Sequence, residues 1–258
     1  MKLSEKQWEK VAPLIPDGPV REDGKGRPWK DKRTVLEGVL WIVWTGARWR
    51  DLPTLYPPYQ TCHRRFQQWV ESGVFEQVIE TLAKDLQERG AINMSECFID
   101  GTFSLAKKGL LVGTTKRGKG TKVMRVTDAG GVVLSIAIES ANPHEVTLVE
   151  KTLAERFVKE LPEKLIGDKA YDSDPLDQRL EEQGVKLIAP HKTNRKKKAT
   201  QDGRKLRRYK RRWKVERFFA WLFNYRRCIV RHENKHQNFK AVLLLACIMI
   251  YLKSYFHL

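Results

Sequence analysis

The sequence predicts an α/β protein in which an N-terminal helical, helix-turn-helix-like region precedes a mixed-sheet domain. Up to about residue 90, apolar residues recur at the three- and four-residue spacing of amphipathic helices. Beyond that point, short apolar runs rich in Val, Ile and Phe are typical of strands, and helical segments separate the later ones. With 258 residues, of which 41% are hydrophobic, the chain can bury a large core, and global disorder is excluded.

Four helices are expected in the first part of the chain. They cover residues 3–16, 34–46, 61–73 and 74–90. The first begins at Ser4, which has the capping-box spacing to Gln7, and the second ends at Gly46. Residues 17–30 are rich in Gly, Pro and charged residues and are expected to form a loop. We therefore place a helical domain over residues 1–90.

The second part, residues 91–258, reads as alternating strands and helices. Strands are expected at 97–103, 122–128, 132–140, 164–170 and 185–190, and helices at 145–161, 174–184, 209–225 and 241–252. Gly130-Gly131 joins two of the strands as a hairpin. The last two strands flank a helix, which predicts a parallel βαβ unit. Three antiparallel strands followed by this unit is the element order of a ribonuclease H-like domain.

The charge of the chain is concentrated in its last quarter. The net charge is +18, and residues 190–258 carry 20 basic and only 3 acidic side chains. The segment 191–208 is almost entirely basic and polar. A field of this kind suits a polyanion, with nucleic acid as the expected partner. The alternative for this segment is a solvated loop without a partner.

Cysteine usage and hydropathy bear on the location of the protein. The cysteines at 62, 97, 228 and 247 form no CxxC pair, which excludes a zinc ribbon and fits a reducing cytosol. The longest apolar run, residues 241–252, is too short to span a membrane and is expected to be a buried helix. No signal peptide is visible in the first 20 residues. We expect a soluble protein without a membrane partner.

The third helix has a polar face suited to reading DNA. Phe66, Trp69 and Val70 are expected to be buried. The opposite face is expected to carry His63, Arg64, Arg65, Gln67 and Gln68. Arg and Gln make bidentate contacts to guanine and adenine in the major groove, so a helix-turn-helix is one interpretation. A helical bundle with a basic exposed face explains the same pattern equally well.

Three carboxylates stand where a metal-dependent phosphoryl-transfer site needs them. Asp100 and Asp168 each follow an apolar triplet, at the ends of the first and fourth predicted strands. Glu216 is the single acidic residue in a strongly basic helix, and Asp172 is the alternative to Asp168. Carboxylates converging from separate elements can hold Mg²⁺, which prefers oxygen ligands.

Each carboxylate also has an ordinary structural explanation. Asp100 precedes a glycine and would be a turn former, and Asp168 would pair with Lys169. Glu216 would form an i,i+4 pair with Arg212. One shared expectation favours the site: in a ribonuclease H-like sheet the first and fourth strands are neighbours.

Three segments carry a resemblance to a known family. They are FIDGTF (98–103), LIGDKAYDSD (165–174) and YKRRWKVERFFAWL (209–222). They resemble the signature segments of DDE transposases from bacterial insertion sequences. In the third segment, Tyr209, Arg212 and Glu216 match the Tyr-x₂-Arg-x₃-Glu-x₆-Lys pattern of this family. Phe223 stands where the pattern has Lys, and Arg226 or Arg227 is the expected replacement for that phosphate contact.

Further segments extend the resemblance to residues 3–235. TGARWRDLP (45–53) and RRFQQW (64–69) resemble the N-terminal region of the family. ANPHE (141–145) is similar to a family segment that usually ends His-Asp, with Glu145 in place of the Asp. Several spaced motifs therefore agree.

The resemblance implies the ligands and the DNA contacts. Asp100, Asp168 and Glu216 would be the catalytic residues and would bind two Mg²⁺ ions, for which Mn²⁺ would substitute. GTTKRGKG (113–120) would be either a hairpin loop or a DNA contact. The residues expected to contact DNA are Arg64, Arg65, Gln67, Gln68, Lys116, Arg117, Lys119, Arg195, Lys196, Lys197, Lys198, Tyr209, Arg212 and Arg217.

The function implied is that of an insertion-sequence transposase. It would bind terminal inverted repeats through residues 1–90, cut double-stranded DNA, and join the freed 3′-hydroxyl to target DNA. Two ends must be joined, so the working unit would be at least a homodimer, in the bacterial cytoplasm and associated with the nucleoid. The alternatives are a DNA-binding regulator on a degenerate transposase scaffold and a ribonuclease H-like nuclease without strand transfer.

Overall fold

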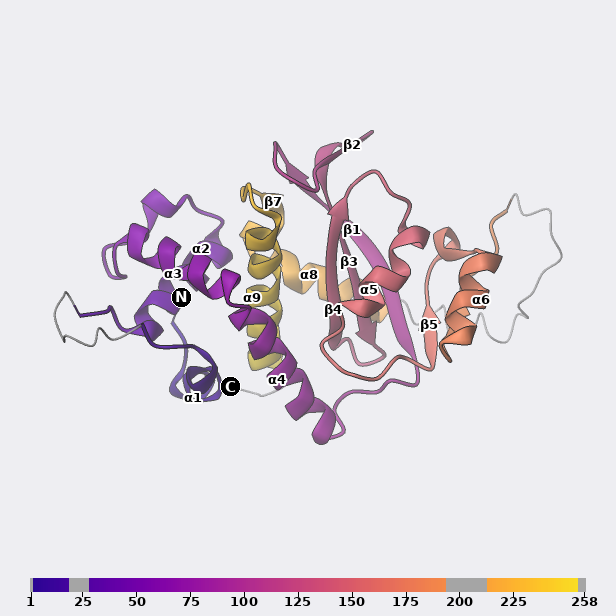
Figure 1. Cartoon of the computed structure of the whole chain (residues 1–258), viewed down its shortest axis with the longest axis horizontal. Helices are drawn as coiled ribbons and strands as arrows, with labels where there is room; N and C mark the ends of the chain where they lie inside the picture. Colours follow the sequence, from indigo (N-terminus) through magenta and orange to yellow (C-terminus); the bar gives the residue numbers. More distant parts are fainter. Residues whose placement is uncertain (1, 19–27, 194–212, 255–258) are drawn as a thin grey trace.

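The computed structural model describes residues 2–18, 28–193 and 213–254, with residues 213–217 described as backbone only. Figure 1 shows N-terminal helices at one end, a sheet at the other and one long helix between them. The N-terminal elements are α1 (Glu5–Val11), η1 (Ala12–Leu14), α2 (Lys32–Thr45), η2 (Trp49–Asp51), α3 (Tyr59–Glu71) and α4 (Val74–Glu88).

The four predicted helices are confirmed, although the first ends at Val11 and continues as η1, and the second and third each begin two residues earlier than predicted. The Ser4 side chain accepts from the backbone N–H of Gln7 and the Gln7 side chain accepts from the backbone N–H of Ser4, which completes the capping box of α1. Gly46 ends α2 in the left-handed conformation, with φ 71° and its N–H bonded to the carbonyl of Ile42. A residue with a Cβ would be strained at that position.

The described residues of the second part form a seven-stranded mixed sheet. Its strands are β1 (Cys97–Ala106), β2 (Gly113–Thr115), β3 (Gly118–Asp128), β4 (Val133–Ser140), β5 (Lys164–Ile166), β6 (Lys186–Ile188) and β7 (Val230–Arg231). The main order is β2-β3-β1-β5-β6, with β4 also paired to β3 and β7 to β1. β3 is antiparallel to β1 and β4, whereas β1, β5 and β6 are parallel. The predicted parallel βαβ unit and the predicted neighbouring strands are therefore confirmed.

The remaining described elements cover the sheet or connect its strands. They are η3 (Glu145–Leu148), α5 (Val149–Ala154), η4 (Lys169–Tyr171), α6 (Asp174–Glu182), α8 (Trp213–Phe223), η6 (Arg226–Cys228) and α9 (His236–Ser254). The predicted helix over 145–161 is wrong in its length, because regular helix ends at Ala154. The backbone N–H of Phe157 donates to the carbonyl of Leu134, and Ser135 forms a β-bridge with Arg156. Residues 156–157 therefore pair with β4 instead of continuing the helix.

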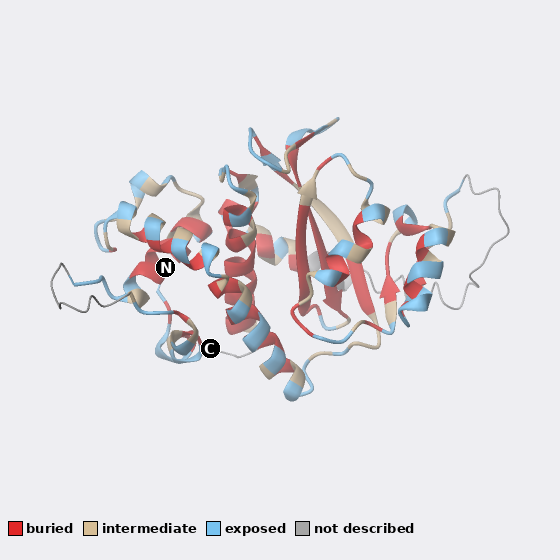
Figure 2. Ribbon diagram, in the orientation of Figure 1, coloured by how far each residue is buried: buried red, intermediate tan, exposed pale blue. Residues whose placement is uncertain are grey.

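Helix α9 is the centre of the core. It packs against α2, α3 and α4 and also against β4, and the Tyr251 hydroxyl donates a hydrogen bond to the carbonyl of Val133. Figure 2 shows it buried along nearly its whole length. Within the described ranges, α9 alone has the length and apolar composition to cross a membrane, but 78% of that stretch is buried inside the protein. Both predicted parts of the chain thus share one hydrophobic core.

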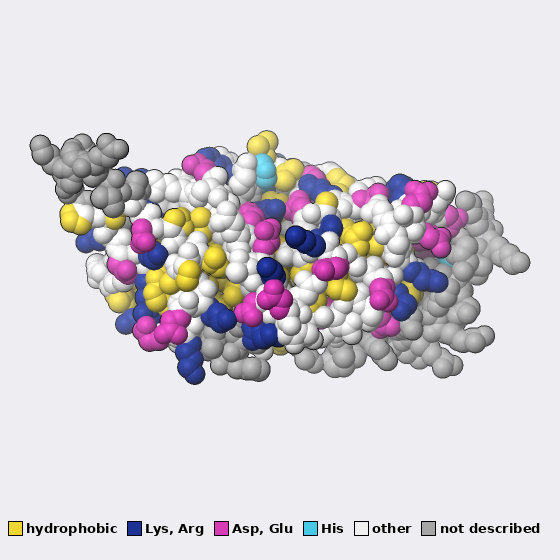
Figure 3. Space-filling view, turned by 60° about the horizontal axis from the view of Figure 1, so that its bottom comes forward, with side chains coloured by type: hydrophobic (Ala, Val, Ile, Leu, Met, Phe, Trp, Pro, Cys, Tyr) yellow, Lys and Arg dark blue, Asp and Glu magenta, His cyan; other side chains and the backbone are white. Residues whose placement is uncertain are grey.

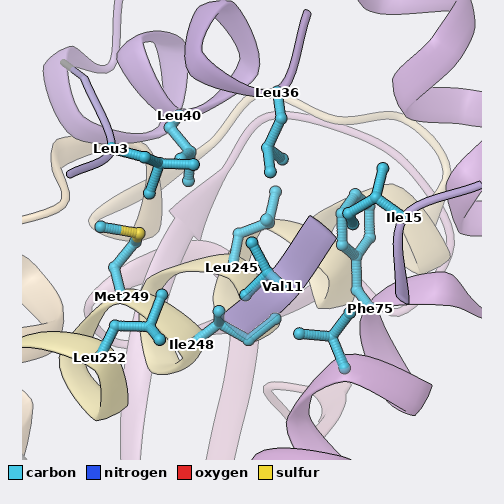
Figure 4. A pocket seen from close by; sticks show the side chains of 11 residues that line it. Leu3, Val11, Ile15, Leu36, Leu40, Phe75, Leu245, Ile248, Met249 and Leu252 are labelled. Atoms are coloured by element: carbon cyan, nitrogen blue, oxygen red, sulfur yellow. The ribbon is translucent and has the colours of Figure 1, made fainter. Parts of the chain in front are cut away.

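An apolar pocket lies where α1, α2, α4 and α9 meet (Figure 4). It is lined by Leu3, Val11, Ile15, Leu36, Leu40, Phe75, Val78, Leu245, Ile248, Met249 and Leu252. All of these side chains are aliphatic, aromatic or thioether groups, which offer a hard metal or a phosphate no oxygen or charged ligand. The pocket belongs to the helical core and contributes no chemistry to the carboxylate region of the sheet.

Candidate active site

The register of two parallel strands brings Asp100 and Asp168 to the same edge. Phe98 on β1 lies opposite Ile166 on β5. Asp100 and Asp168 each stand two residues beyond this pair, so both carboxylates emerge beside one another from adjacent strands. Both residues are partly exposed, which leaves the carboxylates accessible from solvent.

Asp100 lies in the middle of β1 and not at its end. β1 continues to Ala106 because it pairs with β3 through Leu105, so the prediction that the strand ends at Asp100 is wrong, and so is the turn explanation. A Cβ at Gly101 would lie 2.8 Å from Oε1 of Glu145 and 2.9 Å from Sδ of Met124. The glycine is therefore needed for close approach of Glu145 to the strand.

A fully buried arginine faces Asp100 across the ladder. Arg125 is the direct partner of Asp100 in the β1–β3 register, and its Nη2 lies 3.7 Å from Oδ2 of Asp100. The Arg125 side chain has 0% exposure, against 18% for Asp100. Oδ1 of Asp100 accepts a 2.9 Å hydrogen bond from the N–H of Gly101. A cation and a backbone donor therefore orient this carboxylate.

Asp168 begins the short turn η4. Its Oδ1 accepts a 2.7 Å hydrogen bond from the N–H of Ala170, which fixes the side chain as the cap of this turn. The ring of Tyr171 packs over Gly167, where a Cβ would approach it to 2.6 Å. The small residue before Asp168 thus lets the turn fold back on the strand.

Tyr171 connects a third carboxylate to this region. Its hydroxyl donates a 2.9 Å hydrogen bond to Oε2 of Glu145, and its side chain is fully buried. Burial raises the pKa of Tyr171 far above its usual value, and the charges of Glu145, Asp100 and Asp168 raise the pKa further. The hydroxyl therefore stays protonated and remains a donor to Glu145.

Asp172, the alternative to Asp168, is occupied in a structural role. Its Oδ1 lies 2.9 Å from Nδ1 of His191, and its Oδ2 accepts a 2.9 Å hydrogen bond from the N–H of Lys192. These contacts fasten the turn after β5 to the chain that follows β6. The geometry favours Asp168 over Asp172.

The third predicted ligand is carried by α8. This helix contains Glu216 and packs against β1 and α9. The side chains of Glu216 and Arg217 lie outside the described residues. Six further residues that were expected to contact DNA also lie outside the described residues: Arg195, Lys196, Lys197, Lys198, Tyr209 and Arg212. Within the described side chains, no group of three or more His, Cys, Asp or Glu is placed to hold a metal ion.

The prediction that Arg65 lies on the exposed, DNA-contacting face of α3 is wrong. Arg64 and Gln68 are exposed and Gln67 is half-buried, whereas Arg65 is only 4% exposed. The Arg65 guanidinium lies 4.6 Å from the ring centroid of Trp29 and 5.4 Å from that of Trp69. Burial lowers its pKa. Arg65 is a packing residue because it follows Cys62 and precedes Trp69 on the inner side of the helix.

The basic hairpin is a real structural unit. Lys116, Arg117 and Lys119 are exposed where β2 turns into β3. The Thr115 hydroxyl accepts from the N–H of Arg117 and donates to the carbonyl of Gly118, which closes the turn. In the view of Figure 3, basic and acidic side chains are otherwise interspersed over the described surface.

Arg227 cannot replace the Lys that is missing at position 223. Its Nε lies 2.7 Å from Oε1 of Glu233, and its Nη1 donates to the carbonyl of Ala47 at 2.9 Å. Arg227 is 5% exposed, so the expectation that it replaces the phosphate contact of the missing Lys is wrong. Arg226, the other candidate, is exposed. Phe223 stacks on Phe219, with centroids 6.0 Å apart and planes at 14°.

Two family models match the chain. The putative transposase family of IS4/5 matches residues 3–79, and the transposase DDE domain matches residues 93–251. A putative transposase for insertion sequence element IS402 from Burkholderia cepacia is 30% identical over 145 residues, covering 53% of this chain and 65% of that protein. A 16.2 kDa IS402 protein of unknown function from the same organism is 33% identical over 103 residues, covering 39% and 70%.

One further relative and one solved structure are also similar to the chain. The uncharacterised protein y4sN of Sinorhizobium fredii is 35% identical over 83 residues, covering 32% of this chain and 64% of that protein. The chain thus spans about two thirds of the length of these relatives. A piggyBac transposase in a synaptic complex with hairpin DNA has a TM-score of 0.54 at 10% identity, covering 96% of this chain and 70% of that one. At this identity the likeness concerns the fold.

The mixed sheet and its element order define a ribonuclease H-like domain, as predicted, with two aspartates at the edge shared by adjacent parallel strands. The DDE domain model covers more than half of the sequence. The chain belongs to the DDE transposase family of bacterial insertion sequences.

Proposed function

We propose that this protein is a DNA transposase that binds the terminal inverted repeats of its element and catalyses metal-dependent cleavage and strand transfer. The observation that carries the proposal is the shared edge of β1 and β5, from which Asp100 and Asp168 both emerge. Membership of the DDE transposase family supports the same conclusion.

The residues at this edge fit divalent ions. Asp100 and Asp168 supply hard oxygen donors on partly exposed side chains, and α8, the helix that contains Glu216 in its sequence, packs on β1. Oxygen donors of this kind suit Mg²⁺, and Mn²⁺ accepts the same ligands. When bound, two such ions supply Lewis-acid stabilisation of the attacking and leaving oxygens.

The protein groups prepare the site before DNA arrives. The N–H of Gly101 and the Arg125 guanidinium hold the Asp100 carboxylate from one side, and the N–H of Ala170 holds Asp168. Fixing both side chains in advance removes the entropy of ordering them during the reaction. Their partial exposure leaves room for a phosphodiester to approach.

Duplex DNA would be bound by surfaces on both parts of the chain. Arg64, Gln67 and Gln68 on α3 would read the inverted repeat, since these side chains suit base edges. Lys116, Arg117 and Lys119 at the hairpin would contact phosphates. Joining two element ends requires two copies of the site, so we propose a homodimer as the smallest assembly on DNA.

A single reaction tests the proposal. The purified chain is incubated with Mg²⁺, a duplex containing the end of the DNA element that encodes it, and a plasmid target. Joined products support a transposase. Cleavage without joining indicates a ribonuclease H-like nuclease, and binding without cleavage indicates a regulator on a degenerate scaffold, the alternative that Phe223 favours.

A further inference from the structure

We propose that Arg125 is a positioning residue of the active site, which links the Asp100 carboxylate on β1 to the aromatic face of α8. The helix that contains Glu216 is thereby held against the strand that contains Asp100. This inference rests on the proposed function, because it assigns a role within that site.

The first half of the link is ionic. Arg125 lies opposite Asp100 in the ladder, 3.7 Å away, and has no exposed surface. Directly opposite residues of an antiparallel pair project on the same face of the sheet. A cation removed from water is stable only when compensating groups surround it. The carboxylate of Asp100 is such a group, so the ladder register fixes the side of the sheet on which the guanidinium lies.

The second half of the link is aromatic. The guanidinium carbon of Arg125 lies 3.7 Å from the ring centroid of Phe219 and 5.3 Å from that of Phe218, both on α8. A cation over an aromatic face is attracted by the ring quadrupole, and more strongly when it is desolvated. Phe218 is itself 1% exposed. Arg125 therefore contacts β1 on one side and α8 on the other.

Phe223 extends the contact along the helix. It stacks on Phe219 one helical turn away. Phe223 is also the residue that departs from the Tyr-Arg-Glu-Lys pattern, in which this position is Lys. An aromatic side chain here supports the ring that Arg125 contacts, which a lysine could not do by stacking.

The geometry of a helix relates this stack to Glu216. Glu216 precedes Phe219 by three residues and Phe223 by seven, and these spacings lie on one side of an α-helix. Holding Phe219 against Arg125 thus sets the rotation of α8 about its axis. The rotation decides whether the Glu216 position faces the Asp100 edge.

The test uses the full chain and four variants. Arg125→Met removes the charge at similar length, Arg125→Lys keeps the charge without the planar group, and Phe219→Leu removes the ring. The double variant Arg125→Met with Phe219→Leu measures coupling between the two residues. The matched control is Arg231→Met, which removes another buried arginine, lying 5.7 Å from the ring of Phe239 and away from the carboxylates.

The first measurement is amide hydrogen exchange of residues 213–223, without DNA or metal. Arg125→Met and Phe219→Leu are each expected to speed this exchange about tenfold. Arg125→Lys is expected to have a smaller effect, and the double variant no more than either single change. The control is expected to leave exchange in α8 unchanged relative to the rest of the protein. Independent, additive effects, or unchanged exchange in α8, would overturn the link.

The second measurement is the rate of cleavage of the element end. Arg125→Met is expected to slow cleavage at least tenfold in Mg²⁺ and less in Mn²⁺, because Mg²⁺ demands near-ideal octahedral geometry. Arg125→Lys is expected to restore part of the rate. Cleavage at the parental rate by Arg125→Met would overturn the positioning role. If the parental chain itself fails to cleave, the proposed function fails, while the exchange result still decides whether Arg125 joins β1 to α8.

Discussion

The hydroxyl of Tyr171 donates a 2.9 Å hydrogen bond to the carboxylate of Glu145, and Glu145 lies against Gly101, the neighbour of Asp100. The contact joins the turn after β5 to the turn after β4. It places a buried phenol and a third carboxylate next to the two aspartates.

Tyr171→Phe is expected to lower the free energy of unfolding by about 1–2 kcal/mol at pH 7, because Glu145 loses a donor. Urea unfolding measures this change. Glu145→Gln keeps an acceptor for the hydroxyl and is expected to cost less. An equal or larger loss in Glu145→Gln would mean that the hydrogen bond does not dominate the stability of this contact.

The same tyrosine predicts a pH dependence. The folded protein raises the pKa of Tyr171 above the unfolded value of about 10. The folded state therefore holds its proton where the unfolded state releases it, so stability is retained below about pH 10 and falls at higher pH. Between pH 8 and 11, the free energy of unfolding is expected to fall less steeply with pH for Tyr171→Phe than for the parental chain. Parallel curves would contradict this.

Asp100→Asn, Asp168→Asn and Glu216→Gln are each expected to abolish cleavage and strand transfer while duplex binding persists. Each change removes a metal-binding charge at nearly constant volume. Gel analysis of products in Mg²⁺ and a binding titration measure the two properties. Asp172→Ala is the control: it removes the contacts to His191 and Lys192, so reduced stability is expected with cleavage retained. Near-normal strand transfer by one of the three variants would remove that residue from the site.

On α3, Arg64 and Arg65 are expected to behave differently. Arg64→Ala is expected to reduce the preference for the inverted repeat by about 1–3 kcal/mol at particular bases, with normal stability. Arg65→Ala is expected to lower the free energy of unfolding by about 1–3 kcal/mol, because the guanidinium packs between two tryptophans. Competition binding and thermal unfolding separate these effects. A uniform loss of affinity in Arg64→Ala would indicate a phosphate contact only.

The basic segments predict a salt dependence. Replacing Arg195, Lys196, Lys197 and Lys198 with Ala is expected to flatten the plot of log affinity against log salt by about three or four units if all contact duplex phosphates. Preference for the inverted repeat over random duplex is expected to change little. The hairpin variant with Lys116, Arg117 and Lys119 changed to Ala is the comparison. An unchanged slope would identify 195–198 as a solvated loop.

Local sequence signals predict most of the elements and the neighbouring positions of Asp100 and Asp168. The capping box at Ser4 and the glycine stop at Gly46 act through neighbouring residues, so both could be read directly. Asp100 and Asp168 could be paired because a βαβ unit makes its strands parallel neighbours. The two-residue strand β7 has no alternation to detect and was missed.

Contacts that depend on long-range register could not be read in this way. Arg125 stands between the apolar residues Met124 and Val126 of β3, and only the pairing of β1 with β3 shows that it faces Asp100. Glu145 reaches the site through a turn and a glycine 44 positions earlier in the chain. Arg65 is different, because its helical spacing to Cys62 and Trp69 places it on the inner face despite its charge.

The position of α9 between the N-terminal helices and the sheet has a consequence for synthesis of the protein. Helices α2, α3 and α4 leave the ribosome long before residues 236–254. They pack on one another, but the part of each helix that contacts α9 stays uncovered until that helix arrives. N-terminal portions of many chains fold first during translation. In this fold the shared core is complete only when α9 has been made. A message truncated upstream of α9 is therefore expected to yield a chain of low stability that chaperones and proteases recognise.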